Sequence, residues 1–470
     1  MRFCPFIAAV FLAAGCAHYQ PQPLSPAAAV SRFEARCLDD PGLKAVLEQN
    51  AGRPVADWPQ RAWDLNDLTQ AAFYFHPGLQ VARAQWLVAV AGEITAGARP
   101  NPTVTVNPSY DSQIPGNYSP WLVPVSFDVP IETAGKRGKR LAEAAAAAES
   151  ARWNFIATAW QIRRGVRAGL QDLNAADKRA NVLAGQFVLQ KKIVNLLRGR
   201  FAAGEISRPE LVAAEIALNQ TQLDLSDAES ARAAARSNLA QALGLDEAAL
   251  AGRKFEFEFP AVGLEELTAP QARAMALRSR ADILAALADY AVAEDDLQLE
   301  VARQYPDLHL GPGYAWNNGN AGDNQWSLGL TLELPLLDQN QGPIAEAQAR
   351  RKLAAAKFLE LQSQIIGQID LALDQIKAAR EQLKNGNDLL ASQRQQEASL
   401  KAQVTAGAAD PLDLLAAQLA TGSARLTTLD NEAKWQLAVG ALEDALQRPT
   451  DSLAVALENI SAQGPEGRNN

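Results

Sequence analysis

The sequence is poor in the residues from which metal sites and disulfide frameworks are built. It has three cysteines, three histidines and two methionines in 470 residues. None of the histidines (His18, His76 and His309) has a second ligand at the spacing of a zinc site. The sequence also lacks a phosphate-binding loop, a nucleophile–base pair and a paired-carboxylate motif. We therefore expect no metal site, no bound cofactor and no enzymatic activity.

Long apolar runs and an excess of basic residues are missing as well. Beyond the N-terminus no apolar run is long enough to form a transmembrane helix. Lysine and arginine number 44 against 53 acidic residues, so the formal net charge is −9. A protein that binds duplex nucleic acid usually carries a basic stripe, and nucleic acid is therefore not expected as a partner. If the chain crosses a membrane, it must do so with strands.

The N-terminus has the pattern of a secretory signal, with Arg2, a short apolar stretch and small residues before Cys16. The sequence Ala13-Ala-Gly-Cys16 resembles the lipobox of bacterial lipoproteins. This resemblance implies removal of residues 1–15 and lipid on Cys16, and Ala17 in place of an aspartate favours the outer membrane. The alternative is an ordinary signal peptide with a chance cysteine. In a lipidated mature chain only Cys37 remains free, which excludes an intramolecular disulfide.

Four stretches alternate between apolar and polar residues, as strands with one apolar face do. They are residues 103–111, 121–131, 306–316 and 325–336. In the last of them Trp326 and every second residue to Leu334 are apolar. His309 and Glu333 fall on the polar face. Each pair of strands is joined by a short polar loop, which predicts two hairpins.

Most of the remaining chain is predicted to be long helix, and its pattern occurs twice. The expected helices cover about 29–50, 67–99 with a break near His76, 139–203, 210–243, 270–303, 343–405 and 412–446. Pro102, Tyr110 and Gly204 match Pro306, Tyr314 and Gly407 at an offset near 204. This correspondence indicates a tandem duplication. The predicted units are a tether and N-terminal segment (16–66), a first repeat (67–251), a linker (252–269), a second repeat (270–448) and a tail (449–470).

Apolar residues recur every seven positions along the long helices, as in a coiled coil. The series are Val166, Leu173, Ala180, Phe187, Val194 and Phe201, then Leu211, Leu218, Leu225 and Leu239, then Ile369, Ile376, Leu383 and Leu390, and finally Leu412, Leu419, Leu426 and Ala433. A helix of ~65 residues is ~100 Å long. These helices cannot fold into a compact globule.

Sharp turns are predicted between the long helices of each repeat. Ser207 and Glu210 form a capping-box pattern with Pro209 between them. Asp410, Pro411 and Asp413 repeat this arrangement. Gly204 and Gly407 stand where the preceding helices must end. Each repeat therefore closes in a helical hairpin far from its strands.

The predicted strands demand a larger assembly. About ten residues suffice for a tilted strand to span a bilayer. Four strands cannot close into a useful barrel, and open edges are not tolerated in lipid. Three copies would supply twelve strands, which is enough to leave a lumen. The expected fold is thus mainly α with a membrane β-barrel, in which long coiled-coil hairpins form a helical tunnel below a twelve-stranded trimeric barrel.

This design resembles the TolC-type outer-membrane efflux factors. The resemblance covers about Asp67 to Arg448 and rests on Ala98-Arg-Pro-Asn-Pro102, Val129-Pro-Ile131 before Gly135-Lys-Arg137, and Phe201-Ala-Ala-Gly-Glu-Ile-Ser207. The stretches Leu310-Gly-Pro-Gly-Tyr314 and Trp326-Ser-Leu-Gly-Leu330 are most similar to the CzcC-like branch of heavy-metal efflux systems. The resemblance implies a homotrimer in the outer membrane of a Gram-negative bacterium. Its partners would be a periplasmic membrane-fusion adaptor and an inner-membrane pump of the resistance–nodulation–division class.

The resemblance also implies roles for particular residues. Asp413 falls where the family places an aspartate at the closed end of the pore; the alternative is that it only caps its helix. The resemblance places a second pore aspartate one turn later, where this chain has Ala416. The tips that would dock the adaptor comprise Gly204, Ser207, Pro209, Leu211, Gly407, Asp410 and Leu414. His309 and Glu333 would face the lumen.

The leading interpretation is a passive conduit for solutes, with divalent heavy-metal cations such as cobalt, zinc, cadmium, nickel or copper as the expected cargo. An alternative is the same conduit serving an organic-drug pump or type I protein secretion. A second alternative is a lipid-anchored coiled-coil scaffold without a pore.

Overall fold

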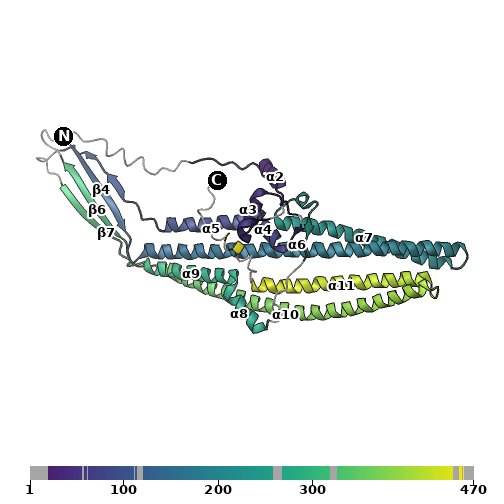
Figure 1. Ribbon diagram of the computed structural model, residues 1–470. Helices are drawn as coiled ribbons and strands as arrows, with labels where there is room; N and C mark the ends of the chain where they lie inside the picture. Colours follow the sequence, from purple (N-terminus) through teal and green to yellow (C-terminus); the bar gives the residue numbers. More distant parts are fainter. Residues whose placement is uncertain are drawn as a thin grey trace.

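The computed structural model describes residues 19–55, 58–60, 62–110, 112–113, 120–257, 267–317, 325–447, 455–457 and 459. The predicted signal peptide and Cys16 lie outside these residues. The protein is elongated, with a β-sheet at one end and helical hairpins that extend away from it (Figure 1).

The element order confirms the predicted fold class, with the sequence helix–hairpin–helix–turn–helix occurring twice. The helices are α2 (Pro26–Glu34), α3 (Pro41–Ala51), α4 (Leu65–Phe75), α5 (Pro77–Ala96), α6 (Lys136–Ala202), α7 (Arg208–Leu243), α8 (Ala269–Ser279), α9 (Ala281–Ala302), α10 (Gln341–Thr405) and α11 (Pro411–Leu446), with a 3₁₀ turn, η1, at Glu247–Leu250. The strands are β1 (Ala62–Trp63), β2 (Thr103–Val106), β3 (Ser109–Tyr110), β4 (Trp121–Ile131), β5 (Lys254–Phe255), β6 (Leu308–Asn317) and β7 (Gln325–Leu332).

Several predicted boundaries were wrong. Residues 29–50 form two helices, because Asp40 caps a new helix that begins at Pro41. The stretch 103–111 is split into β2 and β3 around Pro108, which has no backbone N–H to donate. The last strand ends at Leu332, so Glu333 lies just beyond it. The expected helix 270–303 is broken at Arg280, whose ψ of 131° is extended.

Among the described residues the main sheet runs β2–β4–β6–β7, with β3 also paired to β4, and every pairing is antiparallel. The two hairpins therefore lie side by side and meet through β4 and β6. Val125 lies opposite Tyr314, and Tyr314 lies opposite Trp326. This register places most of the apolar residues of the four long stretches on one face, which confirms the predicted alternation.

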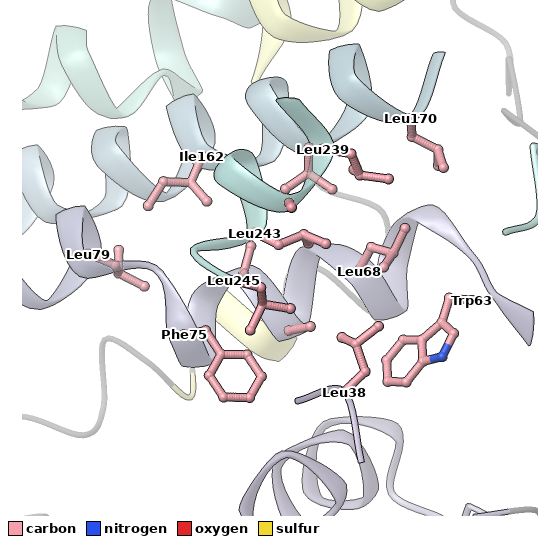
Figure 2. Packing of buried hydrophobic residues seen from close by; sticks show 14 of the residues in the cluster. Leu38, Trp63, Leu68, Phe75, Leu79, Ile162, Leu170, Leu239, Leu243 and Leu245 are labelled. Atoms are coloured by element: carbon pink, nitrogen blue, oxygen red, sulfur yellow. The ribbon is translucent and has the colours of Figure 1, made fainter. Parts of the chain in front are cut away.

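Among the described residues two large hydrophobic cores hold the helical body, and a small third cluster consists of Ala180, Leu183 and Ala228. The larger one joins α3, α4, α5, α6 and α7, and Figure 2 shows Leu68, Leu170 and Leu239 meeting from three of these helices. The smaller one joins α8, α10 and α11 around Ile365 and Leu442. In α6 the heptad residues Val166, Leu173, Ala180 and Val194 are buried, whereas Phe201 is 39% exposed. The heptad residues of α6 thus lie mostly in a packed apolar seam, as predicted.

Each helical hairpin ends against the start of a shorter helix. At the end of α7, Gly244 packs against the backbone of His76, the N-cap of α5. The Nη1 of Arg36 donates to the carbonyl oxygens of Phe75 and Gly244 at 2.9 and 3.0 Å. At the end of α11, the Nη1 of Arg280 donates to the Ala445 carbonyl at 2.8 Å. An arginine thus satisfies the carbonyl groups that end the long helix at both junctions.

Asp67, in the first turn of α4, gives the fold a pH dependence. Burial, with Asp64 and Glu256 nearby, raises its pKa to about 6, although Gln60 donates a hydrogen bond to it. A carboxyl group that holds its proton more tightly when folded makes the free energy of unfolding fall as pH rises from about 4 to about 6.

We expect Asp67→Asn to abolish this fall and to stabilise the protein at pH 7.5 by about 1–2 kcal/mol, since the side chain is only partly buried. Thermal unfolding of both proteins from pH 4 to 8 tests this. The two should be equally stable near pH 4. An unchanged slope between pH 4 and 6 would show that Asp67 is not responsible.

Candidate functional site

The sheet has one apolar and one polar face, and the apolar face is largely exposed. Its most exposed members are Trp326 at 83% and Leu328 at 76%. At the hairpin end, Tyr110 meets Trp121 with ring centroids 5.2 Å apart, and Tyr314 meets Trp326 at 4.7 Å. Aromatic pairs at the end of an exposed apolar face are typical of a strand region that contacts lipid near its boundary.

The polar face carries the predicted residue His309. Its Nδ1 lies 3.0 and 3.1 Å from the two carboxylate oxygens of Asp128, on the neighbouring strand β4. The His309 side chain remains 40% exposed. Glu333 is exposed near the base of the sheet but outside β7. We expected His309 and Glu333 to lie on the same polar face of the strands. Only His309 lies in a strand, whereas Glu333 lies just beyond the end of β7.

The predicted tip residues form two turns that lie together at the far end of the molecule (Figure 1). Gly204 and Gly407 have φ of +75° and +72°, so each turn uses the backbone conformation that glycine adopts without strain. Ser207 and Glu210 form the predicted capping box, with Pro209 in the first turn of α7. Leu211 and Leu414 are half-buried just behind the turns.

Asp410 joins the two tips. Its carboxylate accepts the Leu412 N–H at 2.9 Å and, through both oxygens, the Arg200 guanidinium at 2.7 Å. These two interactions hold the pKa of Asp410 below its ordinary value. Since Arg200 ends α6 and Asp410 begins α11, the ion pair connects the first repeat to the second.

Asp413 lies in the first turn of α11 with an exposed side chain. The N-cap of this helix is Asp410, and the backbone N–H of Asp413 donates to the Asp410 carbonyl at 3.0 Å. The capping role that we considered for Asp413 is therefore performed by the residue three positions earlier.

The contact between the repeats, along α6 and α11, is polar for most of its length. We call it the α6/α11 seam. From the tip inward it contains these pairs: Arg200–Asp410, Gln186–Ser423, Arg179–Asp430, Lys178–Glu432, and Gln171 with the Gln436 carbonyl. The heptads had predicted apolar seams, and in this contact Leu426 of α11 packs against the small cluster of Ala180, Leu183 and Ala228. The two hairpins are thus joined along α6 and α11 mainly by polar and charged side chains.

The inner end of the seam is buried and more strongly bonded. Arg163 Nη2 lies 2.5 Å from Glu443, and Arg167 Nη1 lies 2.8 Å from the other oxygen of that carboxylate. Arg167 also pairs with Asp444 and donates to the Gly440 carbonyl at 2.8 Å. Burial raises the pKa of Asp444 despite the nearby Arg167 guanidinium. We call these four side chains the seam cluster.

Sequence reasoning missed both Arg200 and the seam cluster. A basic residue in the last turn of a helix is ordinary, so Arg200 carried no signal of its own. Arg163 and Arg167 are four residues apart and flank the heptad position Val166. Two arginines beside a heptad position could have indicated a buried ionic contact. Their partners, 276 residues or more away, could not be identified from spacing.

Neither metal sites nor membrane-crossing helices are found in the described part of the chain. No group of three or more His, Cys, Asp or Glu side chains there could hold a metal ion. None of the described helices is both long and apolar enough to cross a membrane.

Comparison with known proteins shows where this architecture belongs. The sequence profile of the outer membrane efflux protein family matches residues 68–245 and 272–447. The cobalt-zinc-cadmium resistance protein CzcC of Cupriavidus metallidurans is 24% identical over 254 residues, or 54% of this chain. The chain thus spans 60% of the length of that relative.

Solved structures share the fold at low sequence identity. The outer membrane protein VceC of Vibrio cholerae matches with a TM-score of 0.66 and 19% identity, over 81% of this chain and 95% of VceC. The Campylobacter jejuni CmeC outer membrane channel gives 0.69 and 16%, over 86% and 90%. CusC, whose structures concern transmembrane channel formation, gives 0.68 and 17%, over 85% and 96%. The family profile covers well over half of the sequence and includes both repeats, and the chain therefore belongs to the outer membrane efflux protein family.

Proposed function

We propose that this chain is the conduit of a tripartite efflux pump and that it works as a homotrimer. The family is one of channels, so the expectation that the chain is not an enzyme is confirmed. The observation that carries the proposal is the sheet, which exposes an apolar face and has a free edge at each end among the described residues. One edge is β7 and the other is formed by β2 and β3.

Both edges need a partner if the sheet lies in lipid, because an unpaired backbone group there costs several kcal/mol. The antiparallel edge β7 of one copy can pair with the β2–β3 edge of the next. With β2 and β3 counted as one broken strand, each copy supplies four strands. Three copies then close a ring of twelve, with the apolar face toward lipid and His309 with Asp128 toward the lumen.

The helical hairpins would continue the conduit into the periplasm. The joined tips with Gly204, Ser207, Pro209, Leu211, Gly407, Asp410 and Leu414 are the surface that we assign to a membrane-fusion adaptor. Both tip turns are sharply folded, and the Arg200–Asp410 ion pair connects them. This supports the assignment, because a surface that binds an adaptor must keep its shape. An inner-membrane pump of the resistance–nodulation–division class supplies the free energy that drives transport through the conduit. Lipid on Cys16 anchors the N-terminus.

Divalent heavy-metal cations are the proposed cargo. The support is the likeness to CzcC, a cobalt-zinc-cadmium resistance protein. A deletion strain should lose tolerance to zinc, cobalt or cadmium and regain it with the wild-type gene. Unchanged metal tolerance with lost resistance to organic drugs would favour the drug-pump alternative, and lost protein export would favour type I secretion.

Asp413 is the proposed pore constriction, and its removal has a defined expected effect. Three exposed carboxylates around a narrow mouth attract cations, so Asp413→Ala should lower cation-over-anion selectivity and raise the resting leak. Asp410 caps α11, so the thermal midpoint should change little. Reversal potentials in a salt gradient measure the selectivity.

Asp224→Ala is the matched control, since it removes an exposed aspartate from the middle of α7. It should leave the selectivity unchanged. Wild-type selectivity in Asp413→Ala, together with lower thermal stability, would instead assign Asp413 a purely structural role.

A further inference from the structure

A cluster of basic side chains lies where the strands end and the long helices begin. Four of the first five residues of α6 are basic: Lys136, Arg137, Lys139 and Arg140. Two of them have carboxylate partners within the protein. Lys136 Nζ lies 2.8 Å from Asp307, and Arg140 pairs with Glu132.

The other two basic residues donate only to neutral oxygens. Arg137 Nε donates to the Gly97 carbonyl at 2.6 Å, and Lys139 Nζ donates to the Gln298 side chain at 3.3 Å. Within the described residues no carboxylate lies at ion-pairing distance from Arg137 or Lys139. Arg99, close by at the end of α5, is exposed. We call Arg99, Arg137 and Lys139 the basic collar.

The position of these charges is unfavourable for the helix itself. Positive charge at a helix N-terminus opposes the helix dipole, and the first turn of α6 contains no acidic residue. Arg137 and Lys139 therefore do not serve helix stability through the dipole. An external anion at this level would relieve their conflict with it.

The level of the collar matches the boundary of a membrane. β4 has 11 residues, and a tilted strand of ~10 residues spans the hydrocarbon region. Arg137 and Lys139 follow the end of this strand by six and eight residues, and Arg99 precedes the start of β2 by four. Apolar side chains are exposed at the same level, namely Tyr305 at 60%, Leu336 at 76% and Leu337 at 95%. Exposed aromatic and apolar groups beside basic ones are typical of a surface that contacts lipid headgroups.

The protein leaves room for a headgroup beside Lys139. A groove of about 310 Å³ lies between the start of α6 and α9, and its lining includes Ala134, Lys139, Val301 and Tyr305. Glu294 lines the groove as well, but it pairs with Arg351. The Lys139 ammonium is thus the uncompensated charge of the groove.

We propose that the basic collar binds the phosphate groups of anionic phospholipids in the periplasmic leaflet of the outer membrane. This rests on the proposed function, which places the strands in that membrane. The collar fixes the depth of the strands in the bilayer, and phosphatidylglycerol should be enriched next to the protein over phosphatidylcholine.

Native mass spectrometry of the full-length protein, released from nanodiscs of equal phosphatidylglycerol and phosphatidylcholine, tests the proposal. Wild type should retain phosphatidylglycerol preferentially. In Arg137→Gln/Lys139→Gln the ratio of the two retained lipids should fall by about fivefold or more, because each basic residue near an anionic surface contributes about that factor. Lys191→Gln/Lys192→Gln removes two exposed charges farther along the same helix and should leave the ratio unchanged.

Equal retention of both lipids by wild type, or an unchanged ratio in the collar variant, would overturn the proposal. The same spectra report the oligomeric state. A trimer without lipid preference would refute the lipid site alone. A protein that stays monomeric outside the nanodiscs would refute the proposed function as well.

Discussion

Replacing Arg167 by methionine is expected to lower the free energy of unfolding by about 3–5 kcal/mol, the range found when one partner of a buried ion pair is removed. Arg167 is 4% exposed and bonds Glu443, Asp444 and the Gly440 carbonyl together. Its loss leaves Asp444 without its ion-pair partner, since the ion pair of Arg163 is with Glu443. The damage should be smaller at pH 5 than at pH 8, because Asp444, whose pKa is already raised, can then take up a proton. Denaturant unfolding in detergent, followed by circular dichroism, measures the loss.

Arg179→Met is the matched control on the same helix and the same seam. Arg179 pairs with Asp430 at 3.2 Å, but both side chains are about half exposed. Exposed pairs contribute at most about 1 kcal/mol. If Arg167→Met and Arg179→Met lowered the free energy of unfolding equally, the seam cluster would stabilise the contact between the repeats no more than an exposed ion pair does.

Gly244→Ala should have the second largest effect, about 2–4 kcal/mol, because it combines backbone strain with a clash that cannot relax. Gly244 has φ +73°, and a Cβ there would lie 2.8 Å from the His76 Cα and 3.1 Å from the Phe75 oxygen. Both neighbours are backbone atoms of the α4–α5 junction, which Arg36 holds in place. The denaturation midpoint and slope of the variant give the change in free energy.

Gly252→Ala separates the two contributions. Gly252 has nearly the same φ, +72°, but a Cβ there meets nothing within 4 Å. It should cost only the strain of the left-handed conformation, about 1–2 kcal/mol. Equal losses of unfolding free energy for Gly244→Ala and Gly252→Ala would mean that the backbone at the α5–α7 junction moves aside to accept the methyl group. The junction would then not be tightly packed.

The features that the sequence predicted correctly are those that local residue patterns control. Alternation specified the sheet faces, and the glycine and proline signals at Gly204 and Pro411 located the hairpin ends. The break at Arg280 was missed because no glycine or proline marks it. An arginine side chain that caps a distant helix end holds the backbone there, and such a contact is invisible in local sequence.

The candidate site was predictable only in part, for the same reason. Ser207 and Glu210 form a local motif, and the capping box was found. The polar seam depends on which faces of α6 and α11 meet, and this follows from the packing of the two repeats. Asp413 shows the limit most clearly: its sequence position suited both a cap and a pore ring, and only the contact of Asp410 with Leu412 showed which residue caps the helix.

The central claim, that this chain forms a conduit, is tested most directly by recording currents across a planar bilayer that contains the purified full-length protein. We expect unitary, step-like conductance from trimers, with cation selectivity that falls in Asp413→Ala. Trimers that insert but never conduct, both as wild type and as Asp410→Ala, which lacks the ion pair between the tips, would contradict the account and would favour a coiled-coil scaffold without a pore.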